Sequence, residues 1–354
     1  MLKHCTLQSA FPALGQALPR VALTTLPTII RSAIYPSAHG SREILIKDDS
    51  QSATLYGGNK VRKLEYLLAR ALAKERNVVA TFGAVGSHHA LATALYADQL
   101  QLRSIAFLSH QTRTADIAAT LRLHLQLGTT LVPFGGSYAA RIATLREQLR
   151  GQRTMIIPAG GSSWLGNVAF IDAAFELAGQ IARGECPRPD RLYVATGTMG
   201  TAIGLALGLA LCELPVEVHA VRITPAEITD DTRLQRLANK TALMLNRLDA
   251  KFPRDLARRM QLVLRHDFYG AGYAHTDAAT QRAIAIGRDE LGLQLEATYT
   301  GKAMAALLHD LDDRSVKGMT PLFWQSYHAA PLPVAVNAAG DLSALPAEFS
   351  RYLS

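Results

Sequence analysis

Short apolar runs alternate with longer segments of helical periodicity from residue 60 onward, and this alternation constrains the fold most. The apolar runs, expected as strands, span 78–82, 104–108, 130–133 and 154–158, and the helical segments span about 60–76, 87–100, 114–127, 138–150 and 164–183. Continuous apolar strands separated by helices are typical of βαβ units, whose parallel sheet is covered on both faces. The sequence therefore predicts a three-layer α/β lobe.

A second series of elements follows a proline-containing break at 184–189. Strands are expected at 192–195 and 216–223, and helices at 200–213, about 225–246 and about 275–291. Prolines divide residues 1–42 into short apolar pieces, so this part is expected to be an irregular arm, followed by a short strand at 43–47. Two such series predict two lobes. A cleft between two α/β lobes is where such sheets bind ligands.

The composition excludes several classes of protein. The chain has 354 residues, of which 49% are hydrophobic and 19% charged, as in ordinary globular proteins. No apolar run reaches the length of a membrane span and the first residues do not resemble a signal peptide, so we expect a cytoplasmic protein without a membrane partner. The net charge of +8 is scattered, which favours a solvated surface over nucleic-acid binding. Cys5, Cys186 and Cys212 have neither metal-ligand nor disulfide spacing, so we expect reduced thiols and no metal.

A glycine-rich turn delivers Lys60 onto the start of a helix. Apolar residues recur at helical spacing after it: Leu64, Leu67, Leu68 and Leu72. The first turn of a helix is electropositive, so a lysine held there should lose its proton more readily, as a nucleophilic amine must. Gly57 and Gly58 permit close approach of a ligand, and Asn59 suits either capping the helix or holding a ligand anion. An exposed lysine on a solvated helix is the alternative.

The turn at 196–201 joins a buried strand to an apolar helix. Its sequence is Thr-Gly-Thr-Met-Gly-Thr, in which glycines free backbone N–H groups and the helix dipole attracts an anion. Tight packing of strand against helix is an equally available role for such glycines. The turn lacks the lysine of a P-loop and the spacing of a dinucleotide fingerprint, which disfavours ATP and NAD.

The run Gly57-Gly58-Asn59-Lys60-Val61-Arg62-Lys63-Leu64-Glu65 resembles the lysine segment of one enzyme family. This is the pyridoxal-phosphate (PLP) dependent family of 1-aminocyclopropane-1-carboxylate deaminase and D-cysteine desulfhydrase, which has the tryptophan-synthase-β-like fold type II. Further matches occur in the family's order along nearly the whole chain. The resemblance implies a two-lobe, three-layer αβα fold. Residues 62–172 would form a small lobe inserted in a large PLP-binding lobe of 1–61 and 173–354.

The resemblance also implies roles in binding the cofactor. Lys60 would carry PLP covalently, and Gly197, Thr198, Met199, Gly200 and Thr201 would form the cup for its phosphate. The family's Gln-Ser-Asn-His turn corresponds to 86–89. Ser87 would receive the substrate carboxylate. His88 replaces the Asn that touches the phenolic oxygen of the cofactor, and its imidazole can still donate a hydrogen bond there. His89 matches the family, or is only a residue at a helix start.

Three later motifs bear on the substrate. Tyr273, in Gly-Ala-Gly-Tyr, resembles a tyrosine that faces the substrate and can orient it or pass a proton, with a core tyrosine as the alternative. The turn at 158–163 resembles one that borders the cleft, although a strand-to-helix connector fits it as well. Thr300 stands in Tyr-Thr-Gly-Lys, as in desulfhydrase-like members, whereas the deaminases have Glu there.

The segment 325–328 departs most from the family, which has His-Thr-Gly-Gly where this chain has Gln-Ser-Tyr-His. Ser326 falls where the threonine would, and its hydroxyl can hydrogen-bond the pyridine nitrogen without protonating it. A neutral pyridine suits elimination. Tyr327 and His328 replace the glycines, which implies a reshaped cofactor pocket.

The resemblance implies β-elimination and deamination of a small amino acid such as D-cysteine, giving pyruvate, sulfide and ammonia. A deaminase of the cyclopropane amino acid and a β-lyase with another leaving group are the alternatives within the enzyme class. A non-catalytic PLP-binding protein is the alternative outside it, suggested by His88 and the 325–328 departure. We expect a homodimer.

Overall fold

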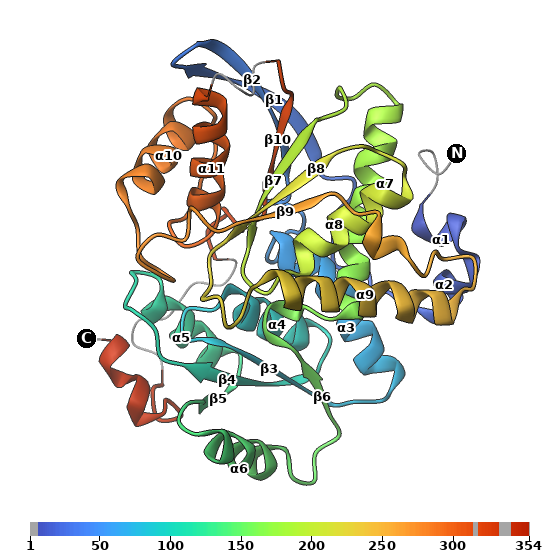
Figure 1. Ribbon diagram of the computed structural model, residues 1–354. Helices are drawn as coiled ribbons and strands as arrows, with labels where there is room; N and C mark the ends of the chain where they lie inside the picture. Colours follow the sequence, from blue (N-terminus) through green and yellow to red (C-terminus); the bar gives the residue numbers. More distant parts are fainter. Residues whose placement is uncertain (1–5, 314–317, 333–340, 354) are drawn as a thin grey trace.

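The computed structural model describes residues 6–313, 318–332 and 341–353, which form two lobes with one sheet each (Figure 1). Strands of the larger lobe lie in the order β1-β2-β10-β7-β8-β9, and those of the smaller lobe in the order β5-β4-β3-β6. Both lobes have helices on the two faces of their sheet (Figure 1), as a three-layer α/β fold requires. The predicted fold class is confirmed.

The sheet of the large lobe consists of β1 (Ile29–Ser37), β2 (Gly40–Asp48), β7 (Arg191–Thr196), β8 (Glu217–Arg222), β9 (Leu262–Arg265) and β10 (Pro321–Gln325). All pairs are parallel except β1 with β2. Late in the sequence, β10 is inserted between β2 and β7, with Leu322 beside both Leu45 and Leu192. This insertion brings residue 326 next to the lysine turn.

Helices cover this sheet on both sides (Figure 1). On one side lie α7 (Trp164–Ala182), α8 (Gly200–Leu211) and α9 (Asp231–Leu248), and on the other α10 (Ala278–Asp289) and α11 (Thr300–Asp312). The helix α8 is buried along nearly its whole length, which explains its almost wholly apolar sequence. Two separate buried clusters result, one on each face of the sheet.

The small lobe has four parallel strands: β3 (Val78–Ala84), β4 (Arg103–Ser109), β5 (Thr130–Pro133) and β6 (Thr154–Ile157). One face is covered by α4 (His88–Gln99) and α5 (Ile117–Gln126), and the other by α6 (Tyr138–Leu149) (Figure 1). Short 3-10 turns at η2 (Ala159–Gly161) and η3 (Leu256–Arg258) connect elements. The helices and strands expected between 60 and 183 are all present, within a few residues of the expected bounds.

The expectation of an irregular arm at 1–42 is wrong for much of its length. It contains α1 (Leu7–Ala10), α2 (Pro12–Ala17) and the nine residues of β1. Pro36 obscured the strand in the sequence, but β1 is at the edge of the sheet, where a residue without an N–H is tolerated. The elements β9 and α11 were also not expected.

The helix α3 (Asn59–Ala73) is anchored from below by buried ion pairs. Arg62 pairs with Asp49 at 2.7 Å and with Glu176 at 3.0 Å, and Lys47 pairs with Glu176 as well. These residues come from α3, the end of β2 and α7, so the pairs connect three elements close in sequence to Lys60.

The C-terminal turn η5 (Ala347–Tyr352) returns to the small lobe (Figure 1). Phe349 and Tyr352 belong to one buried cluster with Val85 and Leu121. The Tyr352 hydroxyl accepts a hydrogen bond from the N–H of Gln111 at 3.1 Å and donates to its carbonyl at 3.0 Å. The division into 62–172 and the remainder stays a proposal, and we propose that η5 belongs with the small lobe.

Among the described helices, none combines the length and the apolar character that a membrane crossing requires. Cys186 and Cys212 are both buried, and Cys5 lies outside the described residues. No group of three potential metal-ligating side chains occurs in the described part of the chain.

Candidate active site

One cavity, of about 570 Å³, is lined by residues of both lobes. All predicted site residues line it: Asn59, Lys60, Ser87, His88, Gly197, Thr198, Met199, Gly200, Thr201, Tyr273, Thr300 and Ser326. The volume is typical of a small-molecule site. The structure therefore brings together side chains that are up to 267 positions apart in sequence, from Asn59 to Ser326.

Backbone packing explains both glycines of the lysine turn. A Cβ on Gly57 would lie 2.2 Å from the Ser50 carbonyl oxygen. A Cβ on Gly58, where φ is +83°, would lie 2.8 Å from that of Ser326. Gly58 is the N-cap residue of α3 and makes no side-chain cap. The glycines thus allow the turn to pack closely against Ser50 and Ser326, with Lys60 in the first turn of the helix.

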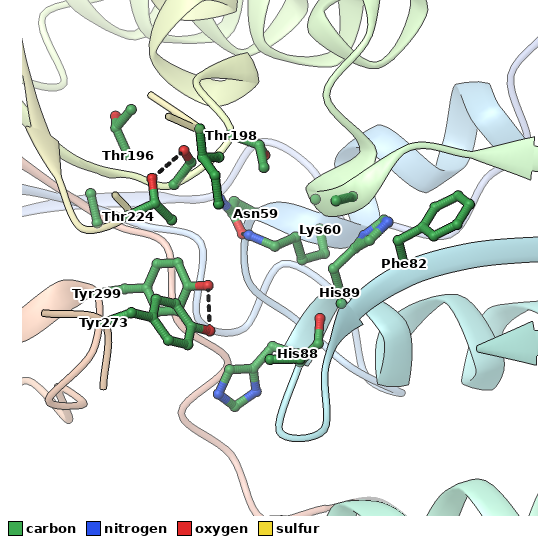
Figure 2. A pocket seen from close by; sticks show the side chains of 18 of the residues that line it. Asn59, Lys60, Phe82, His88, His89, Thr196, Thr198, Thr224, Tyr273 and Tyr299 are labelled. Atoms are coloured by element: carbon green, nitrogen blue, oxygen red, sulfur yellow. Dashed lines mark hydrogen bonds between the residues drawn. The ribbon is translucent and has the colours of Figure 1, made fainter. Parts of the chain in front are cut away.

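Asn59 does not cap α3, which is one of the two roles expected for it. Its Oδ1 accepts a hydrogen bond from Lys60 Nζ at 2.8 Å, and its Nδ2 donates to Thr201 Oγ1 at 3.1 Å. Asn59 therefore connects the lysine to the glycine-rich turn of the large lobe. Figure 2 shows the Lys60 side chain in the cavity, between Thr198 of that turn and His88.

Burial lowers the pKa of Lys60 to about 8, and the negative charge of Glu296 only partly opposes this effect. Desolvation penalises the charged ammonium, so the neutral amine is far more populated near neutral pH than for an ordinary lysine. The sequence predicted a lowered pKa from the helix dipole, whereas burial is the largest cause. The result is a lysine suited to forming a covalent bond with a carbonyl compound.

The turn after β7 has the geometry of an anion site. Met199 adopts a left-handed conformation with φ of 65°, and α8 starts at the next residue. The Gly200 N–H donates to Ser162 Oγ at 3.2 Å, and Ser162 lies 2.7 Å from Thr198 Oγ1. The buried hydroxyl of Thr196 has no hydrogen-bond partner, so it is available to a ligand.

Lys63 lies beside this turn, and the sequence analysis did not assign it a role. Its Nζ donates to the Gly160 carbonyl at 3.1 Å and reaches Ser162 Oγ at 3.4 Å. Burial and the neighbouring Lys60 hold the pKa of Lys63 well below its usual range. Within the described residues no acidic side chain pairs with it. The lowered pKa favours the neutral amine, and an anion bound beside Lys63 would favour its charged form instead. Its spacing of three from Lys60, on the same helix face, was the available signal.

Ser87 and the glycine turn before it form the small-lobe wall. Ser87 is the N-cap of α4, and its Oγ accepts from the Ala90 N–H at 3.2 Å. A Cβ on Gly83 would lie 2.5 Å from that oxygen, so only glycine fits there. The Gly86 N–H donates to Gln111 Oε1 at 3.3 Å. Electropositive N–H groups at this helix start suit a carboxylate.

His89 is buried behind the wall formed by Ser87, although it also borders the cavity. Its Nε2 lies 3.0 Å from Thr81 Oγ1, and its Nδ1 has no partner. Burial keeps the pKa of His89 well below its usual range, so the ring stays neutral. Both roles considered for it from the sequence remain compatible with this position.

His88 belongs to an aromatic cluster that joins Tyr56 to three residues that depart from the family pattern, His88, Tyr327 and His328. Its Nδ1 lies 2.7 Å from the Tyr56 hydroxyl, and its ring packs edge-on against Tyr327 with centroids 5.3 Å apart. The His328 ring lies 4.0 Å from that of Tyr56, and its Nδ1 accepts from the Gly57 N–H at 2.9 Å. The departures at 88 and 325–328 thus contact one another, so they form one packed unit. Burial lowers the pKa of His88 to about 4, which keeps it neutral.

Two tyrosines form a third wall. The hydroxyls of Tyr273 and Tyr299 are 3.0 Å apart, and their rings are nearly perpendicular (Figure 2). Burial raises the pKa of both phenols, so both keep their protons. Lys60 Nζ lies 5.8 Å from the centre of the Tyr299 ring. The sequence analysis gave Tyr299 no role, although it stands next to Thr300 in the motif discussed there.

Glu296 is the acidic residue of the described cavity lining, and the sequence analysis missed it. Its carboxylate accepts hydrogen bonds from the N–H groups of Thr298, Tyr299 and Thr300, each at 2.7 Å. Burial raises its pKa, and these bonds oppose the rise. Because both oxygens are engaged at the start of α11, Glu296 acts first as the cap of that helix. A carboxylate four residues ahead of Thr300 was the signal in the sequence.

Comparisons with known proteins identify the family of the chain. The family model described as "Pyridoxal-phosphate dependent enzyme" matches residues 21–319. The chain is 35% identical to nocardicin C-9' epimerase of Nocardia uniformis subsp. tsuyamanensis, over 88% of this chain and 93% of that protein. It is 30% identical to D-cysteine desulfhydrase of Klebsiella pneumoniae subsp. pneumoniae, over 88% and 94%. A solved structure of an ACC deaminase homologue is 27% identical, with a TM-score of 0.70 and coverage of 90% and 94%.

Proposed function

Because the chain belongs to the family of pyridoxal-phosphate dependent enzymes, we propose that Lys60 binds PLP covalently and that the enzyme breaks bonds at Cα and Cβ of an amino acid. One observation carries this proposal. A lysine with a pKa of about 8 faces a glycine-rich anion site and a second electropositive helix start across one cavity. Such a cavity has a covalent attachment point, a phosphate site and a carboxylate site.

The residues present fit PLP. A phosphate would be held by N–H groups of the 197–201 turn other than that of Gly200, by the hydroxyl of Thr196 and by Lys63, whose amine has no acidic partner among the described residues and would be charged beside a phosphate. Thr300 and Ser326 offer hydroxyls to the pyridine side. Bound PLP supplies an electron sink for the negative charge that develops at Cα.

His88 is proposed to serve the cofactor in place of the family's Asn. When the Tyr56 hydroxyl donates to Nδ1, the ring proton resides on Nε2, which can then donate to an oxygen in the cavity. The low pKa keeps the imidazole neutral, so it stays a hydrogen-bond donor and does not become a cation. Tyr56, His88, Tyr327 and His328 pack together as one cluster. This packing supports a cofactor pocket with changed residues and argues against loss of the pocket.

The proposed reaction is β-elimination on D-cysteine or a close analogue. Ser87 and the neighbouring N–H groups hold the carboxylate, and the freed Lys60 amine takes the α-proton. The Cβ–S bond then breaks, and sulfide leaves with the electron pair. Water completes the conversion of the remaining three carbons to pyruvate and ammonia. The neutral hydroxyls at 300 and 326 favour this course. When the leaving group departs at once, the negative charge at Cα is short-lived, so a weaker electron sink is sufficient. The D-cysteine desulfhydrases at about 30% identity support the assignment.

Epimerisation is the second candidate function. The epimerase relative shares 35% identity with the chain. In Figure 2, the Tyr273–Tyr299 pair and His88 approach the cavity from sides other than that of Lys60. Inversion at Cα requires removal of a proton on one face and its return on the other, and Tyr273, which keeps its proton, can donate from such a position.

One experiment separates these functions. The purified holoenzyme is incubated in D₂O with D-cysteine, L-cysteine, β-chloroalanine and a panel of other amino acids, and pyruvate, sulfide and ammonia are measured. Release of pyruvate and sulfide from D-cysteine is expected, and Lys60→Ala should release none. Recovered substrate with inverted configuration and deuterium at Cα, without pyruvate, would favour epimerisation. Failure to change any amino acid, with cofactor bound, would favour the non-catalytic alternative.

Two further points complete the proposal. We expect the enzyme to act in the cytoplasm, where the cysteines stay reduced, and to form a homodimer. Sedimentation equilibrium of the purified protein tests the second point, because a monomer mass would contradict it.

A further inference from the structure

The cavity continues beyond the reaction centre along the carboxyl edge of the small-lobe sheet. Phe82 lies near the end of β3, Phe107 near the end of β4, and Phe134 directly after β5, and all three line the cavity. The carboxyl ends of parallel strands meet at one edge of a sheet, which is where α/β folds bind ligands. In Figure 2, Phe82 and the Tyr273–Tyr299 pair flank Lys60 from opposite sides.

The three phenylalanines form a continuous aromatic wall. Their ring centroids are 5.3 Å apart for Phe82 with Phe107, 5.3 Å for Phe82 with Phe134, and 5.4 Å for Phe107 with Phe134. Phe107 is fully buried, whereas Phe82 and Phe134 are only partly buried and present ring surface to the cavity. Pro225 and the half-exposed Ile228 line the same cavity from the large lobe. This part of the cavity offers apolar and aromatic surface to a ligand.

Arg141 adds a positive charge to this region. It lies in the first turn of α6 and lines the same cavity. Its Nε donates to the Gly136 carbonyl at 3.2 Å, and no acidic side chain in the described residues pairs with its guanidinium. By contrast, Arg153 of the same lobe pairs with Glu75 at 2.7 Å. The two terminal nitrogens of Arg141 have the geometry to bind a carboxylate in bidentate fashion.

A three-carbon amino acid would leave this region unused. Bound with its carboxylate at Ser87, D-cysteine has only a sulfur atom to extend along β4 and β5. We propose that Phe82, Phe107, Phe134 and Arg141 form a distal compartment that binds the leaving group of a larger substrate. The substrate class is then β-substituted amino acids whose leaving group is an aromatic carboxylic acid joined through sulfur or oxygen. This inference rests on the β-elimination proposed above.

The chemistry is balanced in the same way as for cysteine. Lys60 takes the α-proton, the Cβ–S bond breaks, and the aromatic thiolate leaves with the electron pair and is protonated by water. One further water converts the remainder to pyruvate and ammonia. The distal compartment binds the departing group and takes no part in proton transfer.

Three substrates that give the same pyruvate product test the proposal. They are D-cysteine, S-benzyl-D-cysteine and S-(4-carboxybenzyl)-D-cysteine, compared by kcat/KM for pyruvate release. The carboxybenzyl compound should exceed the benzyl compound by about tenfold, as expected for a charge-assisted hydrogen bond. Arg141→Gln should remove that ratio. Arg146→Gln, an exposed arginine later on α6 that does not line the cavity, should preserve it.

Binding of the leaving group alone gives a second readout. Calorimetric titration of the holoenzyme with 4-(mercaptomethyl)benzoate should show binding that Arg141→Gln weakens by a similar factor and Phe134→Ala also weakens. Equal kcat/KM for the two benzyl compounds, or binding unaffected by both substitutions, would overturn the inference. If no compound yields pyruvate while the thiol binds with this dependence, the proposed reaction fails and the compartment stands.

Discussion

At the scale of single residues, the chemistry of this site depends on which groups lack a partner. Lys60 and Lys63 are three residues apart on one helix, and burial lowers the pKa of each. Among the described residues Lys60 has Asn59 as its one hydrogen-bond partner, whereas Lys63 is held by a carbonyl and a hydroxyl. Two neighbouring buried amines repel each other's charge, and burial disfavours the charged form of both, so an anion bound beside Lys63 would raise the pKa of that amine again.

The lowered pKa of Lys60 predicts the pH dependence of cofactor loading. Only the neutral amine attacks a carbonyl, and its fraction rises as the pH passes through the pKa, here about 8 and not the usual 10.5. The rate of covalent PLP incorporation into the apoprotein should therefore rise with a midpoint near pH 8, followed by visible absorbance. Lys60→Ala should show no such band at any pH. A midpoint above pH 10 would show that Lys60 is not desolvated.

The turn at 197–201 should tolerate loss of a hydroxyl better than added bulk. A Cβ on Gly200 would lie 2.5 Å from Ser162 Oγ and 2.6 Å from Asn167 Oδ1, so Gly200→Val should displace the neighbouring turn and weaken PLP binding strongly. Thr198→Ala should cost about 1–3 kcal/mol of binding free energy, one hydrogen bond to a charged acceptor. Equilibrium dialysis measures both dissociation constants, with circular dichroism as the control for folding. Equal effects would argue that the turn is only structural.

At the scale of elements, the site depends on α3 and on the ion pairs that hold it. Arg62 is 2% exposed and Asp49 is fully buried. Asp49 also accepts a hydrogen bond from Trp324 Nε1 at 2.9 Å, which connects β10 to the same network. The network holds the lysine turn in a fixed position next to Ser326, which follows β10. It accounts for the long polar residues on a helix that is buried on nearly all sides.

Removal of one member of this network should destabilise the whole protein. Arg62→Met leaves the Asp49 and Glu176 carboxylates buried without their main partner, which typically costs about 3–5 kcal/mol of unfolding free energy. Urea unfolding of the apoprotein measures the change. Arg153→Met is the matched control, because Arg153 and its partner Glu75 are 58% and 80% exposed, and it should cost no more than about 1 kcal/mol. Similar losses for both would contradict a buried network.

The elements themselves were largely predictable, and the contacts between them were not. Periodicity located every strand of the small lobe, because each is a continuous apolar run. It did not reveal β1, whose residues alternate between partly buried and exposed and include a proline. The predicted site residues all line one cavity, since the motif resemblance covered them. Tyr56 was missed because its role arises from burial and from partners distant in sequence, His88 and His328. Lys63 and Glu296 stand near Lys60 and Thr300 in sequence, but their burial in the cavity wall is set by the fold and not by that spacing.

At the scale of the whole molecule, the two lobes contribute different walls of the cavity. The large lobe provides Lys60, the anion turn and the hydroxyls of Thr300 and Ser326. The small lobe provides Ser87, His88 and the distal compartment. The aromatic cluster spans both, since His88 contacts Tyr56 and Tyr327 from the other side of the cleft. The residues at 88 and 327 therefore pack against each other across the cleft.

The uncharged residues of the large-lobe wall predict which amino acids react. Thr300 and Ser326 carry no charge, and the carboxylate of Glu296 accepts hydrogen bonds from the N–H groups of Thr298, Tyr299 and Thr300, so the described cavity lining offers no free acid. D-Cysteine and β-chloroalanine, which have good leaving groups, should release pyruvate. The compound 1-aminocyclopropane-1-carboxylate, whose ring opening needs a stronger electron sink, should give little 2-oxobutyrate. Efficient turnover of this compound by the unmodified protein would instead support the deaminase alternative.

Substitution at Thr300 should change the ratio of ring opening to β-elimination. Thr300 Oγ1 lies 3.3 Å from Glu296 Oε1, so Thr300→Glu places two buried carboxyl groups side by side, and their repulsion raises the pKa of the pair. One shared proton then becomes available to the pyridine side, which should increase the ratio of 2-oxobutyrate to pyruvate formed from an equimolar mixture of the cyclopropane compound and D-cysteine. Thr300→Gln, similar in size but uncharged, should leave the ratio low, and PLP absorbance should show that both variants retain the cofactor. An equal rise in both variants would assign the effect to pocket shape and not to the added acid.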